Sequence, residues 1–376
     1  MSEPSSKTIF LAGGGTGGHL YPGIAVAESL RRIAPDLKCL FLCTTREIDR
    51  VILEPTGFEF IPQPIERPHR SVGGLLKFWK SWRETDALVR RTITERQPAA
   101  VVGLGGYAAG VTVRLATHRH IPSALINPDV IPGKANYHLM KKADIACCQF
   151  EETRDHVSTS RRAKLRITGC PIRADFANLP PRAEAAQRLG LEPGLNTLTI
   201  TGASQGAATI NDALPPTLSQ IKMQGWQILH LSGRSHAEGV RAAYRSHNLP
   251  ARVIDFTPAM ADVWAVTDLT VSRSGASTCA ELTACGIPSI LMPYPFHKDQ
   301  HQRLNAEVLA KAGAAVLQDD FRDARKNAEK LLPLLAPLIH DADRRNSMAK
   351  AARTLGKPDA ADTVAHVVTE LVNSGR

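Results

Sequence analysis

The sequence predicts an α/β protein built from two doubly wound domains with parallel sheets. Short β-type runs alternate with helical stretches along the whole chain, glycine-rich turns follow several of these runs, and 376 residues exceed what one hydrophobic core usually covers. Alternation of this kind is typical of βα units, in which a helix connects parallel strands. We therefore expect ligands at the carboxyl ends of the strands, in a cleft that the two halves share.

The strand candidates divide evenly between the halves. In the first half they are Thr8–Ala12, Lys38–Cys43, Ala99–Gly103, Pro122–Ile126 and Asp144–Cys147. In the second half they are Asn196–Thr201, Trp226–Leu231, Arg252–Ile254, Leu269–Ser272 and Ser289–Met292. Helices are expected between most of them, as at Asp299–Lys311, and a last one at Asp359–Val372. Glycine and proline interrupt the pattern at Thr168–Pro181, so we expect the domain boundary there.

Composition narrows the class of protein. Hydrophobic residues make up 43% and charged residues 22%, which is ordinary for a globular chain and excludes a disordered one. No apolar run approaches the roughly 20 residues that cross a bilayer, and the N-terminus has no signal-peptide layout, so we expect a cytoplasmic protein. The seven scattered cysteines are odd in number and predict reduced thiols.

The formal net charge of +10 indicates an anionic partner. Nucleic acid, anionic lipid and phosphorylated substrates all suit such a charge. Because no recognisable nucleic-acid-binding module accompanies it, we expect no nucleic-acid partner.

The first glycine loop, Gly13-Gly14-Gly15-Thr16-Gly17-Gly18-His19, lies between a predicted strand and a helix. Gly13, Gly15 and Gly18 satisfy G-x-G-x-x-G, in which glycines let an anion approach the amides at a helix N-terminus. The pattern suits dinucleotides, phosphosugars and lipid diphosphates equally, and a tight structural turn stays open. A nicotinamide site would also need an acidic residue at the end of the second strand, where only Glu47, set back in the next segment, is available.

Two further glycine turns follow strands, at 103–110 and at 201–208. In the latter turn Ser204 adds a hydroxyl donor to the backbone amides, as expected around a diphosphate. Three such strand–glycine–helix units exceed what one dinucleotide site needs. They indicate two phosphorylated ligands that face each other across a cleft.

Polar side chains suited to a nucleotide and a sugar follow in the second half. The segment Arg273–Thr278 opens a helix whose first turns carry Glu281, a carboxylate that fits either a ribose diol or a capping box. His301, Gln302 and Asn305 then group neutral hydrogen-bonding side chains on one helix face. A sugar with hydroxyls and an acetamide requires such groups.

In this order and spacing, GGGTGGH, GGYAAG, GASQGA, RSGAST with its glutamate, and PYPFHKDQHQ with its following NA resemble the MurG-type N-acetylglucosaminyltransferases of peptidoglycan synthesis, over nearly the whole chain. The resemblance implies a GT-B architecture: two Rossmann-like domains facing a deep cleft. It implies an acceptor- and membrane-facing domain at 1–168, a UDP-sugar-binding domain at 169–355, and a C-terminal helix, 356–376, that packs back onto the first domain. The implied reaction transfers N-acetylglucosamine from UDP-N-acetylglucosamine to the 4-hydroxyl of undecaprenyl-diphosphate-linked N-acetylmuramyl pentapeptide, with inversion.

The resemblance also assigns site residues. It implies that Ser204 binds the donor diphosphate and Glu281 the ribose, with Phe256–Met260 beside the uracil. The other residues implied to bind UDP-N-acetylglucosamine are Thr16, Gly17, Gly18, Asn127, Arg173, Gln205, Gly206, Ala276, Thr278, His301, Gln302 and Asn305. The residues implied to meet the acceptor diphosphate are Gly14, Gly15, His19, Gly105, Gly106 and Tyr107.

One segment departs from the family pattern. The family usually has His-Glu-Gln-Asn where this chain reads Ile126-Asn127-Pro128-Asp129, so Asn127 replaces the glutamate. An asparagine cannot act as a general base, which leaves His19 and Asp129 as candidates for accepting the acceptor proton. A purely structural role for His19 stays open, as does a changed acceptor.

We expect a direct displacement at the anomeric carbon, with amides near Ser204 stabilising the leaving diphosphate, and therefore neither a metal nor another cofactor. Asp341-Ala342-Asp343 has the form of a DxD motif, but a solvated helix face explains it better. His297 and His301 are spaced as metal ligands can be, yet no glutamate follows His297, so the sequence does not predict zinc.

A membrane-binding surface is predicted at 72–83. Its apolar residues are Leu75, Leu76, Phe78, Trp79 and Trp82, with Val72, and the cations beside them are Arg67, Arg70, Lys77, Lys80 and Arg83. Such a helix suits an anionic bilayer surface, although the same stripe could pack on the sheet of its own domain. We expect a peripheral protein on the cytoplasmic face of the inner membrane.

Rival functions remain at this stage. Within sugar-nucleotide chemistry they are a related transferase acting on another lipid and a UDP-sugar epimerase. Outside it they are a nicotinamide- or flavin-dependent oxidoreductase and a UDP-sugar-binding protein without catalysis.

Overall fold

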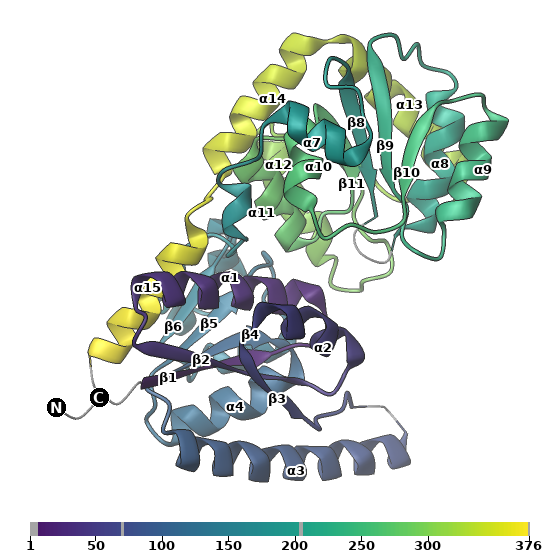
Figure 1. The fold of residues 1–376 in the computed structure, drawn as a ribbon. Coiled ribbons are helices and arrows are strands. Elements are labelled where there is room, and N and C mark those ends of the chain that lie inside the picture. Colours follow the sequence, from purple (N-terminus) through teal and green to yellow (C-terminus); the bar gives the residue numbers. More distant parts are fainter. Residues whose placement is uncertain (1–6, 69–70, 203–205, 375–376) are drawn as a thin grey trace. The chain divides into compact units, whose positions relative to one another are not determined.

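The computed structural model describes residues 7–68, 71–202 and 206–374, which form two compact units (Figure 1). The first unit runs to Arg173 and includes the segment from Asp359 on; the second is Ala174–Pro358. The division after Arg173 lies a few residues beyond the expected one at Thr168. Each unit has its own parallel sheet and core.

The first unit contains a seven-stranded parallel sheet in the order β3-β2-β1-β4-β5-β6-β7. Its strands are β1 (Lys7–Gly13), β2 (Leu37–Thr44), β3 (Glu59–Gln63), β4 (Ala100–Gly105), β5 (Ser123–Asn127), β6 (Ile145–Cys148) and β7 (Leu165–Ile167). The order reverses between β1 and β4, where consecutive connections leave to opposite sides. The loops after these two strands therefore lie side by side at the carboxyl edge of the sheet.

Helices cover both faces of this sheet (Figure 1). They are α1 (Gly17–Ile33), α2 (Glu47–Leu53), α3 (Val72–Arg96), α4 (Gly106–His118), α5 (Lys134–Leu139), α6 (Thr159–Arg162) and α15 (Ala360–Asn373), with 3₁₀ turns at Glu54–Thr56 and Glu151–His156. Alternate residues of β1 supply the two cores: Phe10 faces α3 and α4, whereas Ile9 and Leu11 face α1 and α15.

The last helix, α15, packs on α1 within the first unit (Figure 1). Val364 and Val368 are fully buried in the core that β1 and α1 share. At the rim, Asp362 accepts a hydrogen bond from Ser29 at 2.5 Å and pairs with Arg32. The chain thus returns to the first unit after completing the second.

The second unit repeats the topology with six parallel strands in the order β10-β9-β8-β11-β12-β13. The strands are β8 (Asn196–Thr201), β9 (Trp226–Leu231), β10 (Ala251–Ile254), β11 (Leu269–Ser272), β12 (Ser289–Leu291) and β13 (Ala315–Leu317). Its helices are α7 (Arg182–Leu189), α8 (Ala208–Leu218), α9 (Ala237–Ser246), α10 (Met260–Val266), α11 (Ala276–Cys285), α12 (His301–Lys311), α13 (Ala324–His340) and α14 (Ala342–Leu355), with a 3₁₀ turn at Ala174–Phe176. The strand order here reverses between β8 and β11.

The structure confirms the predicted fold class and every predicted strand, within one or two residues at each end. The sequence does not predict β3, β7 and β13, which are edge strands. β3 contains Pro62 and the exposed Glu59, and β7 and β13 have three residues each. An edge strand buries less side-chain surface than a central one, so its apolar pattern is weaker, and of the four edge strands only β10 is predicted.

Two smaller predictions can also be compared with the structure. All seven cysteines are free thiols, and all but the half-buried Cys39 are buried. Asp341 is the N-cap of α14 and accepts a hydrogen bond from the Arg344 amide at 2.8 Å, which explains the DxD pattern as a helix start. Within the described part of the chain, the helices are all too short or too polar to cross a bilayer.

Candidate active site

The glycine loop after β1 is held by a buried carboxylate. Asp49, on α2, is fully buried and accepts hydrogen bonds from the backbone amides of Gly15 at 2.7 Å and Thr44 at 2.8 Å, and from the Thr44 hydroxyl at 2.7 Å. A methyl group at Gly14 would collide with this carboxylate, so only glycine fits there. Arg46 donates to the Gly15 carbonyl at 2.9 Å. The loop is therefore tied to the segment that follows β2.

His19 lies where the loops after β1 and β4 meet. Its Nδ1 is 3.0 Å from the carbonyl oxygen of Gly14 and 3.3 Å from the Thr16 hydroxyl. Because a carbonyl only accepts, this bond places the proton on Nδ1 and leaves the Nε2 lone pair to accept one. The ring packs on the backbone of Gly105 and Gly106, and a methyl group at Gly105 would collide with it. Gly106 has a φ of 75°, a conformation that also favours glycine.

Two helices begin at this point. Helix α1 begins at Gly17, after the N-cap Thr16, and α4 begins at Gly106, after the N-cap Gly105. For both helices, the described structure shows no hydrogen bond from an N-cap side chain to a first-turn amide. The first-turn amides, including those of Gly18 and the exposed Tyr107, therefore suit an anion at the carboxyl edge of the sheet.

Asn127 and Asp129 follow β5 at the same edge of the sheet. Asn127 is 1% exposed, donates to the Asp129 carbonyl at 2.8 Å and accepts from Asn136 at 3.3 Å. An amide with this burial and these partners supports the loop instead of presenting itself to a ligand. Asp129 is only half-buried, so a carboxylate does remain near the surface in this segment.

Arg173, the last residue of the first unit, lies over the ring of Tyr21 on α1. The guanidinium carbon is 6.0 Å from the ring centroid. Tyr21 itself is 40% exposed, so the pair sits at the surface. The contact directs the Arg173 side chain toward the helix that begins at the glycine loop.

In the second unit the loop between β8 and α8 occupies the corresponding position. Gly206 has a φ of 73°, and a side chain there would collide with the carbonyl oxygen of Ser232. Asn211 on α8 donates to this same carbonyl at 2.9 Å. The predicted residues Ser204 and Gln205 lie outside the described residues, so the loop is defined here by its two ends, Gly202 and Gly206.

A buried histidine supports that loop through Asn211. His230 on β9 is fully buried, with Nε2 3.0 Å from the Asn211 side-chain oxygen and Nδ1 2.9 Å from the Tyr244 hydroxyl. Burial lowers the pKa of His230 to about 3, so the ring is neutral. This histidine orients Asn211 and is not available for catalysis.

Glu281 lies on the second turn of α11, at the other side of the strand reversal. Its Oε2 accepts a hydrogen bond from the indole nitrogen of Trp264 at 2.9 Å, and Trp264 is 2% exposed. Glu281 is too far along α11 to be the capping-box residue, which would stand at Thr278. Ala276 is buried and Thr278 half-buried on the first turn of the same helix.

The N-terminal turn of α12 is linked to the β11 loop. Asn305 is fully buried and donates to the Ser274 carbonyl at 3.3 Å, while the Ser274 hydroxyl donates to the Gln302 carbonyl at 2.8 Å. The Gln302 side chain accepts from the Tyr294 amide at 2.9 Å. Of the three residues predicted to face a sugar, Asn305 thus belongs to the core, whereas His301 and Gln302 are half-buried.

A buried ion pair joins the loops after β11 and β13. Arg273 and Asp320 approach to 2.8 Å, and both side chains are at least nine-tenths buried. Burial would raise the pKa of Asp320, but hydrogen bonds from Thr209, Asn327, the Arg322 amide and Arg273 outweigh it and hold the pKa below its usual range. Arg273 also donates to the Met292 and Pro293 carbonyls, at 3.0 and 3.1 Å. The pair therefore fixes the loops that flank Gly275 and Tyr294.

Comparison with known proteins shows which protein family has this arrangement of two domains. The glycosyltransferase family 28 N-terminal domain matches residues 9–147, and the family 28 C-terminal domain matches residues 197–364. The UDP-N-acetylglucosamine--N-acetylmuramyl-(pentapeptide) pyrophosphoryl-undecaprenol N-acetylglucosamine transferase of Solibacter usitatus is 35% identical over 379 residues, covering 98% of this chain and 97% of the relative. The transferase of the same name from Thermodesulfovibrio yellowstonii is 34% identical over 379 residues, covering 98% of this chain and 100% of the relative.

The chain belongs to the MurG-type N-acetylglucosaminyltransferases of glycosyltransferase family 28. The crystal structure of MurG from Acinetobacter baumannii matches with a TM-score of 0.75 and 24% identity, covering 97% of this chain and 99% of that one, and shows the GT-B fold. The UDP-GlcNAc 2-epimerase of Neisseria meningitidis has a TM-score of 0.71 at 13% identity, covering 97% of this chain and 100% of that one. That likeness shows a shared fold and does not favour an epimerase.

Sequence motifs do not identify three residues that support the loops of this family 28 transferase. Asp49, Trp264 and Asp320 all lie outside the glycine loops, and each acts by bonding to a group within a loop or beside it. The local sequence signal for Asp49 is an acidic residue shortly after β2, and the motif pattern points to the exposed Glu47 instead. Asp49 is the residue that contacts the loop.

The contacts of Asp49 also argue against the rival function of a nicotinamide- or flavin-dependent oxidoreductase. In such a site an acidic residue after the second strand binds the ribose hydroxyls. Here both carboxylate oxygens of Asp49 already accept protein hydrogen bonds, and the side chain has no exposed surface. It cannot also bind a ribose without breaking the glycine loop.

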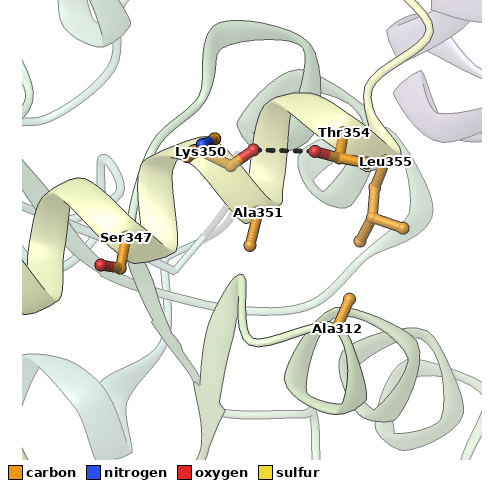
Figure 2. A pocket seen from close by; sticks show the side chains of 6 residues that line it. All are labelled: Ala312, Ser347, Lys350, Ala351, Thr354 and Leu355. Atoms are coloured by element: carbon orange, nitrogen blue, oxygen red, sulfur yellow. Dashed lines mark hydrogen bonds between the residues drawn. The ribbon is translucent and has the colours of Figure 1, made fainter.

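Two surface pockets of the second unit contain none of the predicted site residues. One, of about 400 Å³, lies between α14 and the end of α12, and its lining residues are Ala312, Ser347, Lys350, Ala351, Thr354 and Leu355 (Figure 2). The Thr354 hydroxyl is bonded to the Lys350 carbonyl at 3.1 Å. The other, of about 540 Å³, lies between α8 and α13. Neither gathers the polar groups of a substrate site.

The buried Asp49 gives a stability prediction. Replacing it by Asn (Asp49→Asn) turns one acceptor into a donor that faces amide hydrogens, and should cost about 2 kcal/mol. We expect the Tm to fall by several degrees in thermal unfolding followed by circular dichroism.

The matched control is Asp155→Asn, because the Asp155 side chain is 80% exposed. Its Tm should stay at the wild-type value. Equal Tm values for Asp49→Asn and the control would show that the carboxylate does not hold the loop.

Proposed function

We propose that this enzyme transfers N-acetylglucosamine from UDP-N-acetylglucosamine to the 4-hydroxyl of lipid-linked N-acetylmuramyl pentapeptide, with inversion at the anomeric carbon. The observation that carries the proposal is similarity along nearly the full length to transferases whose name states this donor and acceptor. Two sheets with glycine loops at both strand reversals support it, because each reversal offers one site for a phosphorylated ligand.

On this proposal the second unit binds the donor. The loop that contains Ser204, Gln205 and Gly206 would bind the diphosphate through amides at the start of α8. Glu281 would hold the ribose diol, with its carboxylate oriented by the Trp264 indole. The other donor contacts carried over from the family in this unit are the first turn of α11, with Ala276 and Thr278, and the segment Phe256–Met260.

The sugar would meet the start of α12. His301 and Gln302 have exposed surface there, whereas Asn305 would act by holding the β11 loop in position. Thr16, Gly17, Gly18 and Arg173, all in the first unit, are further donor-binding residues that the family resemblance implies, and Asn127 would support the loop after β5.

The acceptor diphosphate would bind at the first unit. Amides at the starts of α1 and α4, around Gly14, Gly15, Gly105, Gly106 and Tyr107, would surround it. The excess positive charge of the chain would attract such a substrate.

The proton of the acceptor hydroxyl would pass to His19. Its Nδ1 is bonded to the Gly14 carbonyl, so Nε2 accepts the proton as the hydroxyl attacks the anomeric carbon and the bond to UDP breaks. The charge that develops on the leaving diphosphate would be stabilised by the amides preceding α8. Asp129, beyond the buried Asn127, is the alternative base.

The direct test measures UDP released from UDP-N-acetylglucosamine with and without the lipid-linked muramyl acceptor. Release should require the acceptor. Glu281→Gln should raise the KM for the donor at least about tenfold, since a hydrogen bond to a charged group contributes about 1.5–3 kcal/mol. Glu329→Gln, at a side chain that is 61% exposed on α13, is the control. UDP release at the same rate without acceptor would refute the transfer.

The base assignment is tested by His19→Ala and Asp129→Ala. Replacing the base should lower kcat by about 10²–10⁴ while leaving UDP affinity in calorimetry nearly unchanged. His118→Ala, at an exposed histidine of the same unit, should keep full activity. Full activity in both of the first two variants would eliminate both candidates.

We further propose that α3 binds an anionic membrane surface, which places the enzyme peripherally on the cytoplasmic face of the membrane. The helix has two apolar faces. Phe78 and Trp82 are half-buried and pack against the core of the first unit. The residues on the other face are exposed: Val72 at 77%, Leu75 at 44%, Leu76 at 67% and Trp79 at 59%.

The packing interpretation of the stripe therefore holds for the inner face of α3, and we propose the membrane interpretation for the outer face. The outer apolar face follows helical spacing, and the exposed cations Arg67, Lys77, Lys80 and Arg83 lie beside it in the sequence. Arg70 lies outside the described residues. Phe78 and Trp82 contribute to the fold, so replacing them would confound a membrane assay.

The membrane surface is tested with the triple variant Val72→Ser, Leu76→Ser, Trp79→Ser. Co-sedimentation with vesicles of equal parts anionic and zwitterionic phospholipid should weaken at least about tenfold. Full burial of one apolar side chain contributes about 1.5–3 kcal/mol, and the variant loses three such side chains. Wild-type binding should also weaken with added salt. The control is Ile48→Ser, Val51→Ser, two exposed apolar residues of α2. Unchanged binding of the triple variant would remove the proposal.

A further inference from the structure

The loop between β12 and α12 brings together three metal-ligating side chains. His297, Asp299 and His301 each offer one ligand atom, and these atoms lie within 4.8 Å of one another. Asp299 Oδ1 is 2.7 Å from His301 Nδ1. The rings of His297 and His301 stack, with centroids 4.4 Å apart and an interplanar angle of 28°.

A tight turn produces this cluster. Gln300 has a φ of 49°, a left-handed conformation that non-glycine residues rarely adopt, and its amide donates to the His297 carbonyl at 3.3 Å. The turn reverses the chain so that His297 lies over the first residue of α12. On its other side His297 contacts the Tyr294 ring at 4.7 Å between centroids.

The carboxylate of Asp299 makes its short contact to an imidazole and only a long one to the start of the helix. The N-cap of α12 is Gln300, and Asp299 Oδ1 accepts from the His301 amide at 3.5 Å, compared with 2.7 Å to the His301 ring. Strain in the backbone is kept only where the surrounding structure or a function maintains it. Here it places two imidazoles and one carboxylate around one point.

Two imidazoles and a carboxylate are a donor set that divalent transition metals such as zinc, cobalt and nickel prefer. Ligands around one tetrahedral zinc ion lie about 3.4 Å apart, given bonds of about 2.1 Å. His297 and Asp299 are exposed and His301 is half-buried, so small rotations of surface side chains can close the remaining distance.

We propose that His297, Asp299 and His301 bind one divalent transition-metal ion. Three protein ligands leave coordination positions open to water or to an oxygen of another ligand. The site differs from the sequence-based expectation because Asp299, and not a glutamate after His297, completes it.

The site has a consequence that rests on the proposed function. His301 is proposed to face the donor sugar, so a bound ion would compete with UDP-N-acetylglucosamine and inhibit transfer. The ion would then act as an inhibitor and not as a cofactor of the displacement.

Binding is tested on the full-length protein after treatment with a chelator. Titration with Co²⁺ should give one equivalent of bound metal, seen by calorimetry and by visible absorption of cobalt bound to nitrogen and oxygen ligands. His297→Ala, Asp299→Asn and His301→Ala should each weaken binding at least about tenfold. Circular dichroism confirms that each variant is folded.

The control variants are His118→Ala and His247→Ala, which remove exposed histidines of the first and second unit. Both should bind Co²⁺ like the wild type. Absence of one-equivalent binding in the wild type, or equal binding in the three site variants, would overturn the proposed site.

A second measurement separates the site from its consequence. UDP-N-acetylglucosamine affinity, measured by calorimetry, should fall when Zn²⁺ is added to the wild type but not to Asp299→Asn. If Co²⁺ and Zn²⁺ bind as predicted and donor affinity is unchanged, the competition is refuted while the metal site stands. Loss of donor binding in the metal-free wild type would instead count against the proposed function.

Discussion

The reversal of strand order in a parallel sheet is the constraint on which the rest of this structure depends. At β1 and β4, and again at β8 and β11, successive crossovers leave to opposite sides, so two strand–helix loops lie together at the carboxyl edge. At each reversal the N-termini of two helices, α1 and α4 or α8 and α11, follow the two adjacent strands. The candidate ligand-binding residues of each unit are concentrated around its reversal point.

Buried polar groups then give these loops a defined shape. Asp49 bonds the first glycine loop, and the ion pair of Arg273 with Asp320 holds the loops after β11 and β13. Buried charges are costly unless every partner is satisfied, and here several hydrogen bonds satisfy them. The glycines supply the space that these contacts require, so the loops are preorganised and not merely flexible.

The two faces of α3 and the start of α12 show how one segment serves the fold and a surface together. Phe78 and Trp82 pack inward while Val72 and Trp79 remain exposed, and Asn305 is buried one turn after the half-buried His301 and Gln302. In α3 helical periodicity makes this division possible, because residues three or four apart share a face. In α12 the three residues share one face, and burial increases from the first turn to Asn305. A set of residues that is close in sequence therefore divides into supporting and surface members.

The sequence by itself determined the fold class, the central strands, the positions of the glycine loops and the family, because apolar runs and glycine spacing are local properties. Tertiary structure decided which polar residues support those loops. Asp49 and Trp264 reach their partners from other elements, Asn127 and Asn305 become buried, and the turn at Gln300 brings His297 and Asp299 against His301. The physical reason is that burial and hydrogen-bond partners depend on chain segments distant in sequence or on backbone angles, neither of which a local pattern specifies.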